Sequence, residues 1–426
     1  MAREYKDSGI EWIGRIPKDW KVMPHKRLMR KIKELCPEYK GEDIISLTMN
    51  GVIVRDLNAG GKMPTSFDGY QYVHPGNLLM CLFDIDVTPR CVGLIRNEGL
   101  TSPAYSQFVL YEGVNGPYYN YLLRYMDDEK CLLHLSKNLR SSLTEDDFGQ
   151  IPTVFPSLFE QKKIAEYLDG KCGEIDSLIS LQEQMIAQLT DYKQSVITEA
   201  VTKGLDPNAL LVPSGIEWVE NMPKGWCAKK VKYISNNISK GNGITKDEIF
   251  ADGDIPCVRY GEIYSRYGNS FEKCFSYTKR EIQKAPHLIN KGDILCACTG
   301  ELVEEIGKSI VYMGNEPCLA GGDIIIINHS QNPVFLNYAL NSNYAQAQKS
   351  KGKAKLKVVH ISAYEIGSVY ILLPSTNEQR TIAEYLDNKC AEIDTLIALK
   401  QQKIETLKDY KKSLIFEAVT GKIEVV

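Results

Sequence analysis

The sequence contains few of the residue patterns that build catalytic or metal sites. Its six histidines show no paired spacing, and its twelve cysteines include no CxxC pair. We therefore expect no zinc site and no Ser–His arrangement, and we expect reduced, buried thiols. No apolar run approaches about 18 residues and no signal peptide is recognisable, so we expect a cytoplasmic protein without membrane contact.

Cofactor motifs are also missing. Gly307-Lys-Ser309 resembles the end of a phosphate-binding loop, but the position that needs the first glycine is Leu302. The chain has no Asn- or Asp-Pro-Pro-aromatic tetrad, which an amino-methyltransferase uses to hold its target amine. The sequence therefore predicts a non-catalytic chain with no cofactor of its own. A net charge of −3 gives no overall attraction to nucleic acid, so any DNA contact must come from local basic patches.

The strongest positive feature is a duplicated segment. Residues 156–204 and 374–422 are identical at about 30 of 49 positions, with a constant offset of 218 and no gap. A second repeat, Ser8-Gly-Ile-Glu-Trp12 and Ser214-Gly-Ile-Glu-Trp218, has an offset of 206. Because the offset grows by 12, the chain consists of two tandem copies, and the second has a longer variable body.

Each copy of the first repeat reads as a long helix. Capping-box pairs, Ser157 with Glu160 and Ser375 with Glu378, follow a proline in both copies. Apolar residues then recur every three or four positions, as in a coiled coil, and are interrupted at Gln182, Lys193, Lys400 and Lys411. We expect Gly170 and Gly173 to kink or break the first helix. The remaining run, 174–201, would be roughly 40 Å long.

The two bodies read as mixtures of short strands and helices. Trp20 and Trp226 are expected to pack the entry of each body against a helix. Capped turns are expected at Thr144 to Asp147 and at Ser362 to Glu365. The segments that favour strands are Ile44–Leu47, Asn77–Phe83, Gln107–Tyr111, Ile255–Arg259, Asp293–Cys298, Ser309–Tyr312 and Asp323–Ile327, and helices are expected at Tyr118–Met126 and Val334–Ser342. Cys296 and Cys298 would then share one strand face.

Basic residues in both bodies are candidate DNA contacts. Five lysines occupy alternate positions, Lys349, Lys351, Lys353, Lys355 and Lys357, and would point to one side of an extended segment. A solvated loop is the alternative. In the first body the candidates are Arg55, Lys62, Arg90, Arg96, Lys137, Asn138 and Arg140; in the second they are Lys246, Arg259, Arg266 and Lys279. Arg140 could contact a guanine edge and Asn138 an adenine.

These repeats together resemble the specificity (S) subunit of type I restriction–modification systems. The matching frame is Ser8–Trp20, Pro156–Gly204, Ser214–Trp226 and Pro374–Lys422. In the second body, Arg259-Tyr-Gly-Glu-Ile263, Lys291-Gly-Asp-Ile294 and Gly321-Gly-Asp323 also look like that family's target-recognition domains. The first body lacks these motifs.

The resemblance implies an α+β chain in which two mixed α/β target-recognition domains are separated by two long antiparallel coiled-coil-like helices with a pseudo-two-fold repeat. The expected segments are 1–155, 156–204, 205–373 and 374–426. Each target-recognition domain would read half of a bipartite, asymmetric site in double-stranded DNA. The helices would set the gap and dock two methyltransferase (M) subunits, and two motor–nuclease (R) subunits would join for cleavage. S-adenosylmethionine, ATP and Mg²⁺ would belong to those partners.

Two other functions remain open at this point. A self-sufficient nuclease or methylase would need a site that the sequence does not show. A scaffold whose bodies bind protein rather than DNA would keep the same repeated frame.

Overall fold

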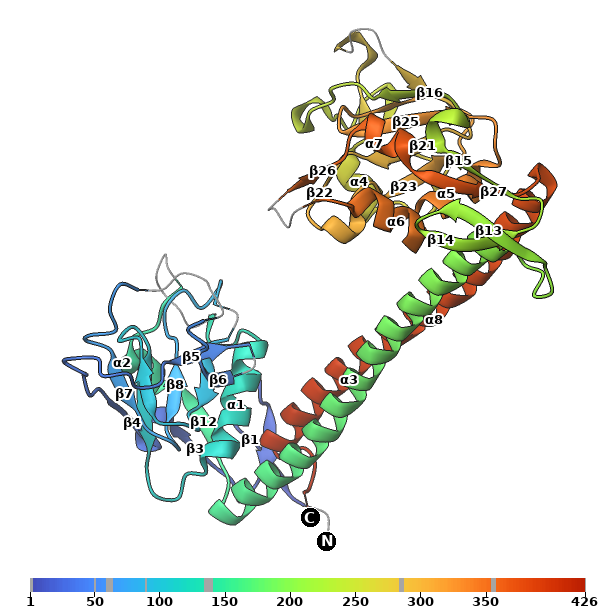
Figure 1. Ribbon diagram of the computed structural model, residues 1–426. Helices are drawn as coiled ribbons and strands as arrows, with labels where there is room; N and C mark the ends of the chain where they lie inside the picture. The colour runs from blue at the N-terminus through green and yellow to red at the C-terminus, as the bar shows by residue number, and fades with distance from the viewer. Residues whose placement is uncertain are drawn as a thin grey trace. The chain divides into compact units, whose positions relative to one another are not determined.

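A computed structural model describes residues 3–49, 51–58, 64–88, 90–133, 141–282, 287–353 and 358–425. Its mixture of helices and strands confirms the predicted α+β class. The chain forms two compact units, Met1–Gln182 with Gln402–Val426, and Glu183–Gln401. Each unit contains one body and the adjoining parts of two long helices, α3 (Leu158–Lys203) and α8 (Thr376–Val419) (Figure 1). Within the described residues, no helix is long and apolar enough to cross a membrane.

The first unit is built on an antiparallel sheet of order β4-β11-β8-β9. Leu78 and Met80 of β8 pack into the core beneath α1, whereas Leu79 packs into a second core on the opposite face. This alternation explains why β8 reads as a continuous apolar run. The elements are β1 (Tyr5–Asp7), β2 (Arg15–Pro17), β3 (Lys21–Pro24), η1 (His25–Arg27), β4 (Met29–Ile32), β5 (Ile45–Thr48), β6 (Gly51–Val54), β7 (Gln71–Val73), β8 (Leu78–Met80), β9 (Val92–Leu94), β10 (Gly99–Thr101), β11 (Ser106–Leu110), α1 (Gly116–Asp128), α2 (Glu145–Gln150) and β12 (Pro152–Phe155).

The second unit is built on a sheet of order β16-β25-β21-β23-β18. Cys296 faces one core and Leu295 the other, and Cys298 shares the core of Cys296, as the strand reading predicted. The elements are β13 (Leu211–Ile216), β14 (Val219–Pro223), β15 (Cys227–Lys230), η3 (Val231–Tyr233), β16 (Ser235–Lys240), η4 (Lys246–Glu248), β17 (Ile255–Val258), α4 (Tyr260–Ser265), β18 (Ser270–Phe271), β19 (Ser276–Thr278), η5 (Arg280–Ile282), β20 (Leu288–Ile289), β21 (Ile294–Ala297), β22 (Thr299–Gly300), η6 (Val303–Glu305), β23 (Ser309–Tyr312), β24 (Cys318–Ala320), β25 (Ile324–His329), α5 (Pro333–Leu340), α6 (Asn343–Ser350), β26 (Val359–His360), α7 (Ala363–Ser368) and β27 (Tyr370–Leu373). The predicted strands and helices of both bodies are therefore present, with ends shifted by a few residues.

The two bodies share one topology despite their divergent sequences. The strand order β4-β11-β8-β9 in the first matches β16-β25-β21-β23 in the second. The smaller sheets also correspond: the β5–β6 hairpin matches β17–β19, the antiparallel β7–β10 pair matches β20–β24, and a parallel bridge from Ile44 to Leu100 matches the parallel pairing of β17 with β24. Both bodies are thus copies of one fold, although only the second contains the sequence motifs that resemble target-recognition domains.

The largest difference in length between the two bodies lies at one place. Two residues, 49–50, separate β5 from β6, whereas 17 residues, 259–275, separate β17 from β19. This inserted segment carries α4 and β18. It therefore adds a surface that the first body does not have.

The serine caps predicted for both long helices are present, and in the first helix Glu160 also accepts the Ser157 backbone N–H, which completes the capping box. The Ser157 and Ser375 hydroxyl oxygens accept the backbone N–H groups of Glu160 and Glu378. Both glutamates also accept the indole N–H of the repeated tryptophan at 3.1 Å, from Trp20 in the first unit and from Trp226 in the second. The two tryptophans are buried, so each fixes the entry of its body against the start of a long helix, as predicted.

The predicted helix break at Gly170 and Gly173 is wrong. Helix α3 is continuous from Leu158 to Lys203. A Cβ atom added at either glycine would have no neighbour within 4 Å, so both lie in open space. Buried residues on the opposite side of this turn, Leu168 and Cys172, hold the helix against the body, and this packing outweighs the low helix propensity of glycine.

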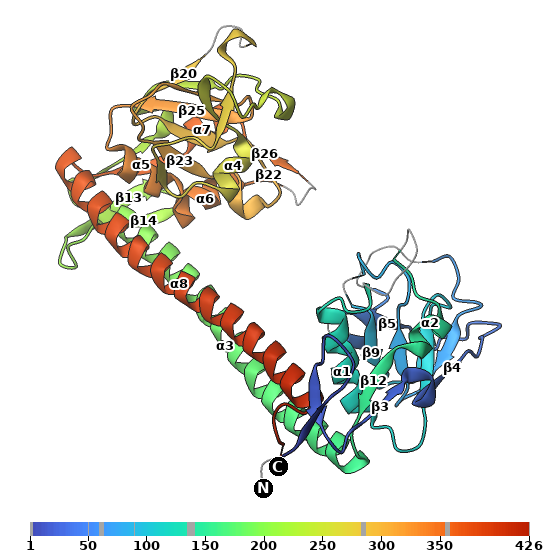
Figure 2. The same cartoon turned by 180° about the vertical axis from the view of Figure 1, so that it is seen from behind.

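Within each unit, parts of α3 and α8 pack side by side in antiparallel fashion (Figures 1 and 2). Lys411 pairs with Asp176 at 2.7 Å in the first unit, and Lys193 pairs with Asp394 at 2.7 Å in the second. These are the same two positions of the repeat with their helices exchanged. Two of the lysines that interrupt the apolar stripe therefore fix the register of the helix pair.

Candidate nucleic-acid interface

A basic cavity of about 820 Å³ lies in the second unit, against the inserted segment. Three of the predicted DNA contacts line it: Lys246 from η4, and Arg259 and Arg266 from either side of α4. The cavity wall also contains Gly243, Gly261, Gly321 and Gly322, which contribute no side chains. The structure thus brings together residues that are 20 positions apart in the sequence.

Arg259 is held by a buried carboxylate that the sequence reading did not single out. Glu262 is 3% exposed, and its Oε2 accepts the backbone N–H of Arg259 at 3.0 Å. The other oxygen accepts the Ser276 hydroxyl and lies 3.7 Å from Nη2 of Arg259. Glu262 directly follows Gly261, and a glutamate in that setting reads as a solvated side chain. The motif Arg259-Tyr-Gly-Glu-Ile263 was therefore the available signal for this role.

The other basic residues of this region are held less tightly. Lys246 and Arg266 are exposed, and the Arg266 guanidinium lies 5.4 Å from the Phe275 ring centroid. Lys279 lies 3.3 Å from Asp252 and 5.1 Å from the Phe250 ring centroid. Lys246 and Arg266 therefore present charge to solvent, while the charge of Lys279 is compensated by Asp252.

The three described lysines of the predicted row, Lys349, Lys351 and Lys353, do not form a row. Lys349 belongs to helix α6, is 3% exposed and donates to the carbonyl oxygen of Gly307 at 2.9 Å. Burial lowers the pKa of its ammonium group to about 8. The prediction that these lysines point to one side assumed an extended backbone, whereas the stretch begins within helix α6.

The next two lysines pair with distant acids. Lys351 lies 2.9 Å from Glu217 and 4.9 Å from the Trp218 ring centroid, and Lys353 lies 2.8 Å from Glu365. These acids are absent from the local sequence, so the row looked uncompensated. Lys355 and Lys357 lie outside the described residues.

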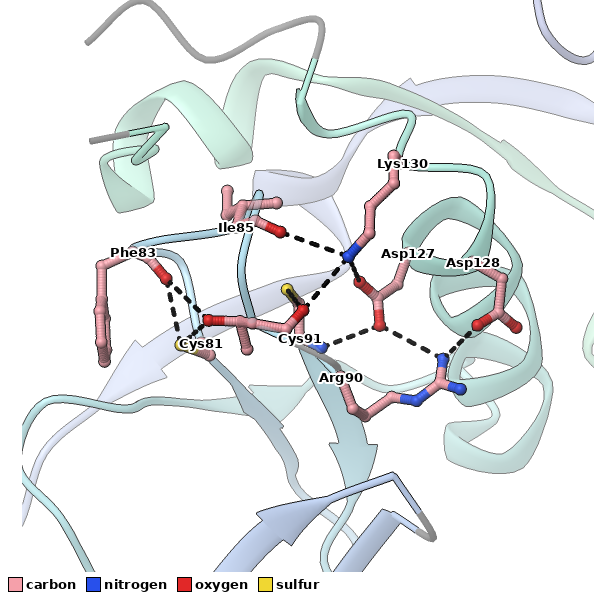
Figure 3. Close-up of polar contacts among 9 residues, drawn as sticks. Cys81, Phe83, Ile85, Arg90, Cys91, Asp127, Asp128 and Lys130 are labelled. Atoms are coloured by element: carbon pink, nitrogen blue, oxygen red, sulfur yellow. Dashed lines mark hydrogen bonds and ion pairs between the residues drawn. The ribbon is translucent and has the colours of Figure 1, made fainter. Parts of the chain in front are cut away.

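In the first unit, the predicted contact Arg90 has a structural role instead (Figure 3). It is 7% exposed and pairs with Asp127 at 3.2 Å and Asp128 at 2.8 Å, both at the end of α1. Asp127 also accepts the backbone N–H of Cys91 and lies 3.7 Å from Lys130. Arg90 therefore joins the segment before β9 to the end of α1, and its charge is compensated there.

The remaining first-unit candidates are dispersed. Arg96 is exposed in the segment after β9, and Arg55 is half-buried after β6, where its backbone N–H donates to Ile44 at 2.7 Å. Lys62, Lys137, Asn138 and Arg140 lie outside the described residues. Among the described candidates, this unit therefore shows no cluster comparable to the cavity of the second.

The helices carry a further repeated surface that the apolar stripe did not reveal. Leu178, Leu181 and Tyr410 are exposed in the first unit, and their repeat equivalents Leu396, Leu399 and Tyr192 are exposed in the second. We call these the helix patches. Their retention in both copies at the offset of 218 was a signal available in the sequence, since exposed apolar residues in a duplicated helix suggest contact with another chain.

Within the described residues, no group of three or more His, Cys, Asp or Glu side chains could hold a metal ion. The cysteines there are free thiols, and burial raises the pKa of Cys296 to about 12. The described residues therefore offer a binding surface and no identifiable metal centre.

Comparison with known proteins agrees with this picture. Residues 223–409 match the family model of the type I restriction modification DNA specificity domain. The chain is 27% identical over 284 residues to the type I restriction enzyme MjaVIII specificity subunit of Methanocaldococcus jannaschii, covering 65% of this chain and 63% of that subunit. It is 22% identical over 282 residues to the EcoKI specificity subunit of Escherichia coli, covering 65% and 58%. The chain thus spans less than two thirds of the length of both relatives.

Solved structures show the same fold. A chain from a structure of the assembly and conformational transition of the type I R-M system matches with a TM-score of 0.71 and 16% identity, over 96% of this chain and 99% of that chain. The HsdS subunit of Thermoanaerobacter tengcongensis matches with a TM-score of 0.50 and 16% identity, over 96% and 98%. The repeated frame, the matching domain and the shared fold together confirm the resemblance: residues 223–409 match a type I restriction modification DNA specificity domain, and the chain as a whole is similar to type I restriction enzyme specificity subunits.

Proposed function

We propose that this chain is the non-catalytic DNA-recognition subunit of a cytoplasmic type I restriction–modification complex. Each unit reads one half of a bipartite, asymmetric site in double-stranded DNA, and α3 and α8 set the gap between the halves. The observation that carries the proposal is the contrast between a repeated frame and divergent bodies. The same ion pairs, caps and tryptophan contacts recur in both units, whereas the basic cavity lies on a segment inserted only in the second.

The helix length suits the proposed gap. Helix α3 is continuous from Leu158 to Lys203, and its run 174–201 is roughly 40 Å long, which is close to one turn of B-DNA, about 34–36 Å. Two recognition domains joined by such helices could meet successive major grooves on one side of the duplex. The two equivalent ion pairs, Lys411–Asp176 and Lys193–Asp394, would keep this length constant by fixing the register of the helices.

The helix patches suit two copies of one partner. Because Leu178 and Leu181 repeat as Leu396 and Leu399, a surface that binds one patch fits the other. We assign this partner as the methyltransferase subunit, with two further motor–nuclease subunits joining for cleavage. S-adenosylmethionine, ATP and Mg²⁺ would then be bound by the partners.

The patches can be tested by mass measurement of the reconstituted complex. Leu178→Asp with Leu181→Asp should leave one methyltransferase subunit bound, and so should Leu396→Asp with Leu399→Asp. The four substitutions combined should leave none. Retention of two subunits by the fourfold variant would exclude the patches as docking surfaces.

The DNA function is tested by mapping methylated bases in a host that expresses this chain with its methyltransferase partner. We expect one split motif that disappears when the chain is omitted. A gel-shift assay of the purified chain separates the other functions. DNA cleavage or methylation by the chain alone would indicate a self-sufficient enzyme, and no DNA binding with or without the partner would indicate a protein scaffold.

A further inference from the structure

The basic cavity of the second unit contains one fixed cation and two exposed ones. Arg259 follows the last residue of β17 and is anchored through both its backbone and its side chain to Glu262. Lys246 and Arg266 have exposed side chains. This difference in anchoring suggests that the three residues have different roles in binding.

Glu262 prepares Arg259 for a directional contact. The carboxylate is buried, so it cannot turn away to solvent, and it is already satisfied by Ser276 and the Arg259 backbone. Its approach of 3.7 Å to Nη2 orients the guanidinium from one edge. The Arg259 side chain is still 33% exposed. The exposed N–H groups of the guanidinium can therefore donate to a ligand.

The opposite wall leaves room for a flat group. Asn242 bridges to Gly321, and Gly322 lies against Gly243, so the backbone itself forms part of the cavity surface. A Cβ atom at Gly243 or Gly261 would meet nothing within 4 Å, which shows that the space in front of them is open. A planar base edge can approach such a wall without displacing side chains.

Base reading and phosphate binding need different cations. Discrimination between bases depends on a guanidinium fork held in one geometry, and the pairing of arginine with O6 and N7 of guanine is the commonest specific contact. Phosphate binding needs charge and reach more than a fixed direction, which suits exposed, flexible side chains. The anchored residue is therefore suited to the base, and the exposed ones to the backbone.

We propose that Arg259 reads a guanine in the half-site bound by the second unit, that Glu262 is its positioning residue, and that Lys246 and Arg266 bind neighbouring phosphates. The inference rests on the proposed function, since it assumes that the second unit binds duplex DNA. It further implies that the two halves are read by different sets of side chains, because only two residues separate β5 from β6 in the first body, where the second carries this segment.

The test uses the complete complex and its mapped motif. The half bound by the second unit is the half that changes when residues 227–373 are replaced by another body. Duplexes carrying each single base change in that half are then compared for wild type, Arg259→Ala, Arg259→Lys, Glu262→Gln, Lys246→Ala and Arg266→Ala. Base preference at the remaining positions of the same half, which the second unit also reads, reports whether each variant is folded.

We expect Arg259→Ala and Arg259→Lys to lose about 5- to 150-fold of preference at one guanine and to keep the other positions. Glu262→Gln should weaken preference at that same guanine. Lys246→Ala and Arg266→Ala should bind all sequences less tightly, each lowering the salt slope by about one, with base preference unchanged.

Two results would overturn the inference while the proposed function stands. The second half of the wild-type motif could contain no guanine on either strand, or Arg259→Ala could keep full preference at every position. A wild-type complex that methylates no split motif would instead refute the proposed function itself.

Discussion

A buried histidine in the first unit makes its stability depend on pH. His25 is fully buried and stacks on Phe148, with ring centroids 4.6 Å apart. Neither ring nitrogen has a hydrogen-bond partner among the described residues, and burial lowers the pKa of the imidazole to about 3. The equivalent residue of the second unit is Val231, whose backbone makes the same hydrogen bonds. The perturbation we choose is therefore His25→Val, which places the residue of one unit into the other.

The size of the effect follows from proton linkage. In the unfolded chain the His25 imidazole has its ordinary pKa of 6.5, so below that pH the unfolded state binds a proton that the folded state excludes. Stability from this group is thus complete above about pH 6.5 and is lost as the pH falls toward about 3. At about 1.4 kcal/mol per pH unit, the loss between pH 8 and pH 5 is about 2 kcal/mol.

The assay is urea unfolding of wild type and His25→Val at pH 8 and pH 5. The change in side-chain volume affects both pH values equally, so it cancels in the comparison. We expect the variant to gain about 2 kcal/mol at pH 5 relative to its effect at pH 8. The reciprocal variant Val231→His should introduce a similar acid sensitivity into the second unit. An identical pH dependence for wild type and His25→Val would refute the reasoning.

Three further predictions concern the helices and the lysines. A double-mutant cycle on Lys411 and Asp176 should give a coupling free energy of about 0.5 kcal/mol, as for other partly exposed ion pairs. The cycle on Lys193 and Asp394 should give the same value within error. Zero coupling in both cycles would show that these ion pairs do not fix the register of the helices. Insertion of seven residues into each long helix keeps the apolar stripe in phase and adds about 10 Å, so the unread gap should grow by about three base pairs with both half-sequences unaltered; an unchanged gap in the methylation map would disprove the spacer role. The double variant Lys351→Ala, Lys353→Ala should leave the salt dependence of the DNA-binding constant unchanged, because both lysines are paired with glutamates. A decrease of about two in the slope of log K against log salt concentration would show that both lysines contact phosphates.

The repeated frame was predictable because local rules and the repeat agree there. Serine caps, apolar spacing and an offset without gaps all indicated the same helices, and the structure contains them as α3 and α8. The break expected at Gly170 was wrong because tertiary packing of Leu168 and Cys172 outweighed local propensity.

The candidate site was predictable only in part, because electrostatic partners come from distant segments. Lys246, Arg259 and Arg266 were identified and do share a cavity, but the buried support from Glu262 was missed. Arg90 looked like a surface residue until α1 brought two aspartates to it (Figure 3). A charge read from sequence alone carries no information on the partner that neutralises it.

The shared topology of the two bodies could not be predicted from the sequence either. Their strand orders match, yet their sequences align at little beyond the capped turn before each long helix. Sheet pairing depends on alternating burial, which many sequences satisfy, so fold similarity outlasts sequence similarity.

The central claim is that the two units recognise DNA independently through one fixed frame. The most direct measurement is the methylation motif of a complex in which residues 227–373 are replaced by the second body of a type I specificity subunit, leaving α3, α8 and the first body intact. Our account predicts that one half of the motif changes, while the other half and the gap length stay as in wild type. A change in both halves, or in neither, would contradict it.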